Sequence, residues 1–385
     1  ISYNKKLMTA LKIFLVFGTR PEALKMAPVF LKLKNHFDTR ILITAQHREM
    51  LDQALEVFRL KADIDLDLME KNQTLASFTV KSIEAISREY IKEKPDLILV
   101  HGDTTTAFTA SLAAFYLNIK VGHVEAGLRT HNLQAPFPEE FNRQIVTKIA
   151  KIHFAPTELN KQNLIKEGVS KKDIFVTGNT VIDSINLTIQ KIKQDTVLQN
   201  KIINKLKKFG FNPSSKANIL ITGHRRENFG SGFKNICIAI KKLSKKYPSY
   251  SFIYPVHLNP IVYEPVNTLL KDLKNVFLID PLGYDHFTYL LSNSYLVLTD
   301  SGGIQEEAPG IGKPVLVMRD VTERPEGISS GTVKLVGTSS DAIIGEVSKL
   351  LDDKKEYSKM SKAVNPYGDG NAADRILSAI KTMKT

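Results

Sequence analysis

Residues 300–307 (DSGGIQEE) combine residue types that suit nucleotide binding. An apolar run ends just before them, a Ser-Gly-Gly turn follows, and a helical pattern begins. Backbone N–H groups at a helix start attract anions, and glycine lets phosphate oxygens approach the main chain. Glu307 lies one helical turn after Gly303, where its carboxylate would accept hydrogen bonds from a ribose diol. The pattern predicts a diphosphate site at Ser301, Gly302 and Gly303, with a helix start capped by serine as the alternative.

A cationic loop follows the first apolar run of the chain. Residues 18–25 (GTRPEALK) place Arg20 and Lys25 around another helix start, where two cations would stabilise a diphosphate. The sequence contains neither a G-x-G-x-x-G motif nor a P-loop, because Gly312-Lys313 is followed by proline. ATP hydrolysis by a P-loop and dinucleotide binding of the usual kind therefore lose support.

Four residues at expected strand ends or helix starts are candidates for proton transfer: Asp103, Glu125, Glu139 and His224. Carboxylates in a water-poor site are readily tuned for this task, and histidine needs little tuning. Asp103 and Glu139 also suit the first turn of a helix, so each has a structural alternative. Together the four predict proton transfer without a nucleophilic serine or cysteine, since Cys237 lies in an amphipathic helix.

His123, Glu125 and His131 come nearest to a metal-binding pattern, but the spacing does not support one. His123 and Glu125 alternate along a strand, and His131 lies in an unpatterned loop. No H-E-x-x-H motif or acidic cluster accompanies them. We therefore expect no protein-bound metal.

Composition narrows the class of protein. The chain has 385 residues, 43% of them apolar, and a formal net charge of +13, which suits a folded protein with an anionic partner. Its lysines are scattered over helical surface rather than gathered in an arginine-rich stripe, so we expect a phosphorylated small molecule as the partner and no nucleic acid.

One cysteine forms neither an internal disulfide nor a structural zinc site. The single cysteine also leads us to expect a cytoplasmic protein. No apolar run approaches about 18 residues, so we expect no membrane insertion.

The elements that must position these residues alternate as strand and helix. Strands are expected at residues 12–17, 40–44, 96–100, 120–125, 152–155, 219–222, 251–256, 276–280, 295–299 and 314–318. Helices are expected at residues 22–34, 47–58, 74–94, 104–117, 139–151, 232–247 and 260–271. Strands that are apolar on both faces and separated by helices predict two doubly wound parallel sheets. A Lys-rich zone at 191–216 is expected to link a first domain, 1–190, to a second, 217–385.

Longer motifs carry a family resemblance. They include GTRPEALKMAP, TAQHREMLDQ, VHGDTTT, GHVEAGLRT, PFPEEFNRQ, TGNTVID, GHRRENFG, YPVHLNP, DSGGIQEEAP and VMRDVTERPEG. In these the chain resembles the bacterial non-hydrolysing UDP-N-acetylglucosamine 2-epimerases, from about Lys12 to the C-terminal NPYGDGNAADRI. The resemblance implies two Rossmann-like domains of the GT-B type with the active site in the interdomain cleft. It further implies that the second domain binds UDP and that the last helix packs back on the first domain.

The reaction that the resemblance implies is a reversible, cofactor-free inversion at C2 of the sugar. UDP-N-acetylglucosamine loses UDP to give 2-acetamidoglucal, and UDP re-adds to give UDP-N-acetylmannosamine for a surface polysaccharide. A homodimer is also implied. A hydrolysing epimerase that releases N-acetylmannosamine and UDP, a GT-B glycosyltransferase, and a sugar-nucleotide sensor or RNA-binding protein are the alternatives. The motifs GHRREN and TAQHREMLDQ favour the non-hydrolysing branch.

Matching motif positions imply roles for individual residues. The nucleotide-binding set is Arg20, Lys25, Leu282, Phe287, Ser301, Gly302, Gly303, Glu307 and Arg324, with Leu282 and Phe287 beside the uracil. The acid/base set is Asp103, Glu125, Glu139 and His224, with Arg143 nearby. A second, activating substrate molecule would contact Gln46, Glu49, Asn72, Glu139, Arg225 and His257. Relatives with a well-defined second site have Gln at position 49 and Arg at position 72, so weaker activation is expected here.

Overall fold

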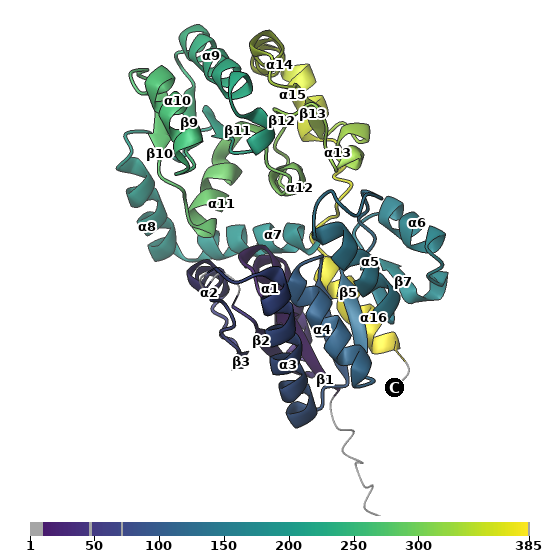
Figure 1. The fold of residues 1–385 in the computed structure, drawn as a ribbon. Coiled ribbons are helices and arrows are strands. Elements are labelled where there is room, and N and C mark those ends of the chain that lie inside the picture. Colours follow the sequence, from purple (N-terminus) through teal and green to yellow (C-terminus); the bar gives the residue numbers. More distant parts are fainter. Residues whose placement is uncertain (1–10, 46–47, 71, 384–385) are drawn as a thin grey trace, which may run out of the picture. The chain divides into compact units, whose positions relative to one another are not determined.

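The computed structural model describes residues 11–45, 48–70 and 72–383, with main chain only at 48–50. These residues divide into two compact units, each built around a parallel sheet (Figure 1). The first unit comprises the residues up to Ser184 together with those from Gly370 onward. The second unit is Ile185–Asp369.

Seven parallel strands form the sheet of the first unit, in the order β3-β2-β1-β4-β5-β6-β7. They are β1 Lys12–Phe17, β2 Asp38–Ile43, β3 Ile64–Asp65, β4 Leu97–His101, β5 Lys120–Val124, β6 Ile152–Ala155 and β7 Ile174–Val176. The accompanying helices are α1 Arg20–Leu33, α2 Arg48–Val57, α3 Leu75–Glu93, α4 Thr105–Tyr116, α5 Glu139–Ile149, α6 Glu158–Lys166, the start of α7 Thr180–Gln194, and α16 Ala372–Thr382.

Six parallel strands form the sheet of the second unit, in the order β10-β9-β8-β11-β12-β13. They are β8 Asn218–Thr222, β9 Ser251–Pro255, β10 Val276–Ile279, β11 Ser294–Thr299, β12 Val315–Val317 and β13 Val333–Leu335. The accompanying helices are α8 Thr196–Lys207, α9 Ser231–Lys246, α10 Pro260–Leu270, α11 Tyr284–Asn293, α12 Ile304–Gly310, α13 Pro325–Ser329, α14 Ser340–Asp352 and α15 Lys354–Ser361.

Burial explains why these runs form parallel strands. Every residue of β4 and β8 is buried, and β1 is buried from Ile13 onward. Strands that are apolar on both faces need helices on both sides, and βαβ connections supply them. The expected α/β class with two doubly wound parallel sheets is therefore confirmed. The short strands β3, β7 and β13 were not predicted from the sequence, because two or three residues are too few to show a period.

The C-terminal helix α16 packs on α1 within the first unit. Asp183 accepts hydrogen bonds from the backbone N–H groups of Ala372 and Ala373 at 3.2 and 2.9 Å. Arg375 adds a bond to the Thr177 carbonyl at 3.0 Å. The chain therefore returns to its first unit after it has completed the second.

The segment expected as a linker, 191–216, contains the end of α7 and all of α8. Ile202 and Leu206 of α8 are fully buried and pack, together with Ile192 of α7, in a core cluster of the second unit. Their side chains are apolar at helical spacing, which gives α8 a buried face. The segment is thus built into the second unit.

Each sheet has one point at which the strand order reverses. The order reverses between β1 and β4 in the first sheet and between β8 and β11 in the second. Ligands of open α/β sheets bind at the carboxyl ends of strands at such points. The segments that follow these four strands carry Arg20, Asp103, His224 and Ser301, whereas Glu125 follows β5 and Glu139 opens α5. No helix in the described part of the chain has the length and apolar character of a membrane span.

Candidate active site

Glu125 follows β5 and holds a cluster of polar groups in the first unit. Its Oε2 contacts Lys25 Nζ, accepts a bond from Asn179 Nδ2 at 3.0 Å, and lies 3.3 Å from His101 Nε2. Burial alone would raise the pKa of Glu125, but Lys25 and His101 outweigh burial and hold it well below its ordinary value of 4.5. Glu125 also adopts a left-handed backbone (φ 64°), which is unusual outside glycine. It is therefore an ionised carboxylate in a strained loop.

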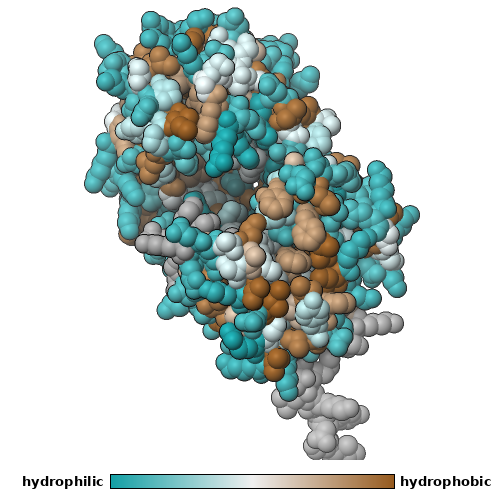
Figure 2. Space-filling view, viewed as in Figure 1, coloured by the Kyte–Doolittle hydropathy of each residue, from teal (hydrophilic) through white to brown (hydrophobic). Residues whose placement is uncertain are grey.

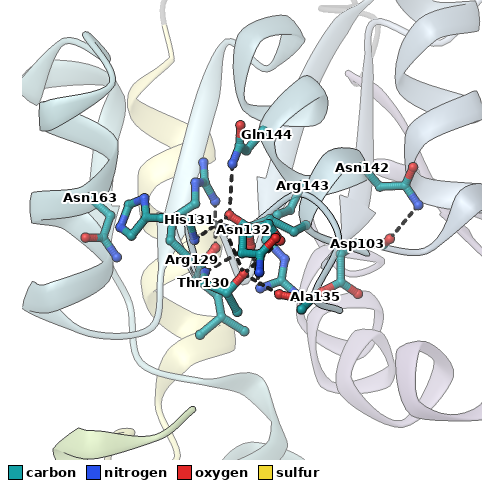
Figure 3. A network of polar contacts seen from close by, with 12 residues as sticks. Asp103, Arg129, Thr130, His131, Asn132, Ala135, Asn142, Arg143, Gln144 and Asn163 are labelled. Carbon is teal, nitrogen blue, oxygen red and sulfur yellow. Dashed lines mark hydrogen bonds and ion pairs between the residues drawn. The ribbon is translucent and has the colours of Figure 1, made fainter. Parts of the chain in front are cut away.

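Asp103 is anchored from α5 (Figure 3). Arg143 Nη2 pairs with its carboxylate, and Asn142 Nδ2 donates to its main-chain carbonyl at 2.9 Å. Arg143 is buried and its Nη1 lies 3.3 Å from Glu140 Oε2. The structure thus brings Asp103 and Arg143 together, as their shared place near the acid/base set requires.

Glu139 and Glu140 open α5 and have contrasting surroundings. Glu140 is fully buried and accepts bonds from the N–H groups of Thr130 at 3.0 Å and His131 at 3.1 Å. Burial raises its pKa, but these bonds and Gln144 outweigh burial and leave it lowered. Glu139 has a buried Oε2 without a hydrogen-bond partner among the described residues. Glu140 therefore fixes the loop, whereas Glu139 keeps an oxygen available for exchange with a ligand.

Glu22 joins the loops that follow β1 and β4. It is 2% exposed and accepts bonds from Gly18 N at 3.0 Å, Thr19 N at 2.8 Å and Thr104 Oγ1 at 2.7 Å. Burial raises its pKa, and the hydrogen bonds offset only part of the effect. The bonds fix the start of α1, which carries the half-buried Arg20.

Sequence reasoning missed Glu22, His101 and Asn179 as parts of the site. All three lie inside quoted motifs, in GTRPEALK, VHGDTTT and TGNTVID. Their motif positions were the available signal, but only the folded chain shows which side chains they contact.

Asp300 joins the loops that follow β8 and β11 in the second unit. It is fully buried, and its Oδ2 accepts bonds from the N–H groups of His224 and Arg225, both at 2.8 Å, and from Asn228 Nδ2 at 3.2 Å. The His224 ring stacks on His257 with centroids 5.7 Å apart. The two histidines and Arg225 are therefore gathered at the strand-order reversal of the second sheet.

The protonation state of His224 follows from these neighbours. Burial lowers its pKa most strongly. The negative charge of Asp300 acts against burial, whereas Arg225 and His257 act with it, and the pKa remains below its ordinary value of 6.5. A histidine in this state is mostly neutral at pH 7, which leaves it able to accept or return a proton.

The glycine turn after β11 is shaped by close contacts. The N–H of Ser301 donates to Thr299 Oγ1 at 2.9 Å. A Cβ on Gly302 would lie 2.7 Å from Arg324 Nη1, so glycine is needed for Arg324 to approach. Arg324 is held by Glu306 Oε1 at 2.6 Å.

Glu307 lies one turn beyond Gly303, and its N–H donates to the Gly303 carbonyl at 2.9 Å. The structure thus places Glu307 beside the same turn as Ser301, Gly302 and Arg324. These groups supply main-chain N–H groups, a cation and a carboxylate to one small region, as binding of a nucleotide diphosphate requires.

The remaining nucleotide candidates lie at the start of α11. Leu282 and Phe287 are half-buried and pack against a core cluster of the second unit. Their contact with a base stays a prediction.

The candidates for a second substrate molecule are only partly described. Gln46 lies outside the described residues, and the side chain of Glu49 is likewise not described. Asn72 is exposed with a left-handed backbone (φ 60°). Arg225 has a buried Nε without a hydrogen-bond partner among the described residues, and exposed His257 accepts a bond from Asn259 N at 3.1 Å.

The histidines near β5 form no metal cluster, and no group of three or more metal-ligating residues is found in the described ranges. His123 bonds through Nε2 to the Gly102 carbonyl at 2.7 Å, and burial lowers its pKa to about 3. Burial raises the pKa of the Cys237 thiol to about 12, so this cysteine is inert.

Comparisons with known proteins identify the family of the chain. The profile of the UDP-N-acetylglucosamine 2-epimerase family matches residues 31–381. The UDP-N-acetylglucosamine 2-epimerase of Campylobacter jejuni is 52% identical over 372 residues, which cover 96% of this chain and 97% of that protein. The crystal structure of UDP-GlcNAc 2-epimerase from Neisseria meningitidis, bound to UDP-GlcNAc, is 50% identical with a TM-score of 0.87 and covers 97% of this chain and 100% of that one.

A more distant structure supports the fold alone. MurG from Acinetobacter baumannii is 14% identical, has a TM-score of 0.58, and covers 97% of this chain and 100% of that one. The two parallel sheets are thus those of a GT-B-like fold. By the extent of its match, the chain belongs to the UDP-N-acetylglucosamine 2-epimerase family.

Proposed function

We propose that the chain interconverts UDP-N-acetylglucosamine and UDP-N-acetylmannosamine by eliminating and re-adding UDP. The observation that carries this proposal is the carboxylate set of the first unit, in which Glu125 is ionised by its partners and Glu139 retains a buried oxygen without one. Inversion at C2 needs such groups because a proton must leave one face and return to the other.

The bond changes balance without a cofactor. One carboxylate takes the C2 proton, the C2–H electron pair forms the C1–C2 double bond, and the C1–O bond breaks with its electrons leaving on UDP. Charge that develops on the departing diphosphate is stabilised by Arg20, Lys25 and Arg324 and by the main chain of the glycine turn. A proton delivered to the opposite face of C2 and re-addition of UDP at C1 complete the cycle.

The contacts support different roles within the acid/base set. Glu125, whose pKa is held down by Lys25 and His101, is a weak base and is suited to orienting Lys25. Glu139 and His224 are better suited to exchanging a proton, since neither is locked in an ion pair with a lysine or arginine among the described residues. Asp103 is also held in an ion pair, with Arg143, and is suited to orienting that cation.

Turnover in deuterated water tests the mechanism. UDP-N-acetylglucosamine supplied alone should yield UDP-N-acetylmannosamine that carries deuterium at C2, and added NAD should not change the rate. Product that retains its original hydrogen would overturn elimination and re-addition. Accumulation of free N-acetylmannosamine would instead identify a hydrolysing enzyme, and a requirement for an acceptor would identify a glycosyltransferase.

We further propose that a second UDP-N-acetylglucosamine activates the enzyme only weakly. The chain has a carboxylate at Glu49 and no cation at Asn72. The family resemblance implies Gln and Arg at these two positions. Losing positive charge weakens attraction for a second diphosphate. The substrate curve should show shallow cooperativity, and UDP-N-acetylmannosamine alone should react slowly until a little UDP-N-acetylglucosamine is added. A hyperbolic curve with no lag in the reverse direction would contradict this.

An apolar patch on the first unit supports a homodimer. Phe108 and Phe115 lie two turns apart on α4, Phe108 packs against Phe141 of α5 at 5.9 Å, and Phe115 contacts Tyr116. Phe115, Tyr116 and Phe141 are exposed, and Figure 2 shows apolar side chains gathered on the face where α4 and α5 lie in Figure 1. We propose that a second copy of this chain covers the patch.

Sedimentation of Phe115→Glu tests the dimer. The variant should sediment as a monomer, whereas Val364→Glu, at an exposed apolar position of the second unit, should sediment like the unaltered protein. An unaltered protein that is monomeric at micromolar concentration would contradict the dimer. The cytoplasmic location stays a prediction.

A further inference from the structure

The two carboxylate oxygens of Asp300 differ in their hydrogen bonding. Its Oδ2 accepts bonds from His224 N, Arg225 N and Asn228 Nδ2. Its Oδ1 is buried and has no hydrogen-bond partner among the described residues. A buried acceptor without a donor is costly, so such an atom calls for an explanation.

The atom that Oδ1 faces is a ring nitrogen. His224 Nδ1 lies 3.6 Å from Asp300 Oδ1, which is beyond hydrogen-bond distance but within reach of a small movement of the ring. The His224 side chain is 45% exposed, so the ring has room to move, whereas the Asp300 side chain is completely buried and fixed by three donors. His224 is therefore the partner that must adjust.

The position of Asp300 in the chain adds a second link. It is the first residue after β11 and immediately precedes the glycine turn at 301–303. One residue thus connects the turn proposed to hold the diphosphate with the backbone and the ring of His224. The family resemblance implied no role for Asp300.

We propose that Asp300 is the positioning residue of His224. In the working enzyme, His224 Nδ1–H donates to Asp300 Oδ1, and this leaves Nε2 as the only ring atom that exchanges a proton with the substrate. The inference rests on the proposed function, in which His224 belongs to the acid/base set. The Asp-His pair of other enzymes orients an imidazole by the same physical means.

The charged groups that face His224 in the second unit give the direction of a test. They are Asp300, Arg225 and His257. Asp300 raises the pKa of His224, and burial, Arg225 and His257 lower it. Removal of the Asp300 charge must therefore lower the pKa of His224 further, whichever way His224 moves its proton.

The variant Asp300→Asn keeps the shape of the side chain and one acceptor oxygen but removes the charge. Its amide N–H₂ would also face Nδ1 and favour the wrong tautomer. We expect kcat to fall about tenfold or more. One limb of the pH–rate profile should be caused by His224 and should disappear in His224→Asn. In Asp300→Asn this limb should move down by about one pH unit. UDP affinity should fall much less than kcat.

Asp183→Asn is the matched control. Asp183 is also a buried carboxylate that accepts two backbone N–H bonds, from Ala372 and Ala373, but none of the described histidines pairs with it. Both variants should lose stability in urea unfolding, and only Asp300→Asn should move the pH limb. If this limb of the pH–rate profile did not move in either variant, Asp300 would have only a structural role and the proposal would be overturned.

Two measurements keep the proposal testable without turnover. Nitrogen-15 NMR of the unaltered protein with UDP should show His224 carrying its proton on Nδ1 when neutral, and an Nε2–H tautomer would overturn the proposal. An NMR titration should place the pKa of His224 lower in Asp300→Asn than in the unaltered protein. A protein without epimerase turnover that still shows both results would refute the proposed function but not the role of Asp300.

Discussion

The two units have similar loop arrangements at the point where the strand order reverses, but the chemical groups in these loops differ. Both place polar loops at a strand-order reversal and both join two loops through a buried carboxylate, Glu22 in the first unit and Asp300 in the second. Around Glu22 lie ion-paired side chains such as Lys25 with Glu125. Around Asp300 lie main-chain N–H groups and a glycine turn.

The difference indicates a division of labour. The first unit also supplies Glu139, whose buried Oε2 has no hydrogen-bond partner among the described residues, so this unit is suited to proton transfer at the sugar. Main-chain donors carry no proton to exchange, so the turn of the second unit is suited to holding phosphate oxygens. His224 is the exception, because it brings a titratable ring to the second unit.

The largest effects are expected in the acid/base set. Glu139→Gln should lower kcat by roughly 10²–10⁴, the usual range for a general acid or base, and should change UDP affinity much less. Asp103→Asn, Glu125→Gln and His224→Asn should lower kcat in the same range. Kinetics and calorimetric titration with UDP measure the two quantities.

Glu140→Gln is the neighbouring control for Glu139→Gln. It should mainly destabilise the first unit, because Glu140 accepts two backbone N–H bonds that glutamine only partly replaces. If both variants lost UDP affinity as strongly as turnover, the division of labour between the units would be wrong.

A smaller effect is expected on nucleotide binding. Gly302→Ala should weaken UDP about 10- to 150-fold, since a Cβ there displaces Arg324 and removes a charge-assisted contact worth about 1.5–3 kcal/mol. Arg20→Ala should weaken UDP by a similar factor. Calorimetry at constant salt measures both, and an unchanged affinity in Gly302→Ala would remove Arg324 from the diphosphate site.

Acid stability separates the two units further. The pKa of Glu125 is lowered in the folded protein, so its contribution to stability is present above about pH 4.5 and is lost as the pH falls through its folded pKa. The stability difference between the unaltered protein and Glu125→Gln should therefore shrink below pH 4.5. Urea unfolding between pH 7 and pH 3 measures it.

Glu323 provides the counterpart in the second unit. Arg319 and Arg324 outweigh burial and lower its pKa to about 2. The stability difference for Glu323→Gln should also shrink below pH 4.5, but it should be smaller throughout, because this side chain is 42% exposed and solvent screens its ion pairs. A larger difference than that of Glu125→Gln would reverse the comparison.

The smallest effect is expected at Gly345 in α14. A Cβ there meets nothing within 4 Å, so Gly345→Ala should raise stability by up to about 1 kcal/mol through better helix propensity. UDP affinity and turnover should not change, because Gly345 lies outside the site. Thermal unfolding measures the gain, and a loss of stability would show that the helix cannot accept a side chain there.

Sequence by itself determined the architecture of this protein. Apolar runs such as 12–17 and 219–222 can be recognised in the sequence because burial on both faces leaves few polar residues in a strand. The loops after these runs can also be recognised, because their charged residues and glycines contrast with the apolar residues before them. Arg20, Asp103, Glu125 and Ser301 could all be chosen on that ground, and the family motifs supplied Arg143 and Arg324.

Tertiary structure decided which of these side chains work together. Lys25 and Glu125 are a hundred residues apart, and only the neighbouring positions of β1, β4 and β5 in the sheet bring them into contact. The different roles of Glu139 and Glu140 also cannot be predicted from two consecutive glutamates in the sequence. They depend on which carboxylate accepts hydrogen bonds from the main chain of the preceding loop. Local pattern reflects burial along one segment, whereas charge state and orientation depend on contacts between segments, and these exist only in the folded chain.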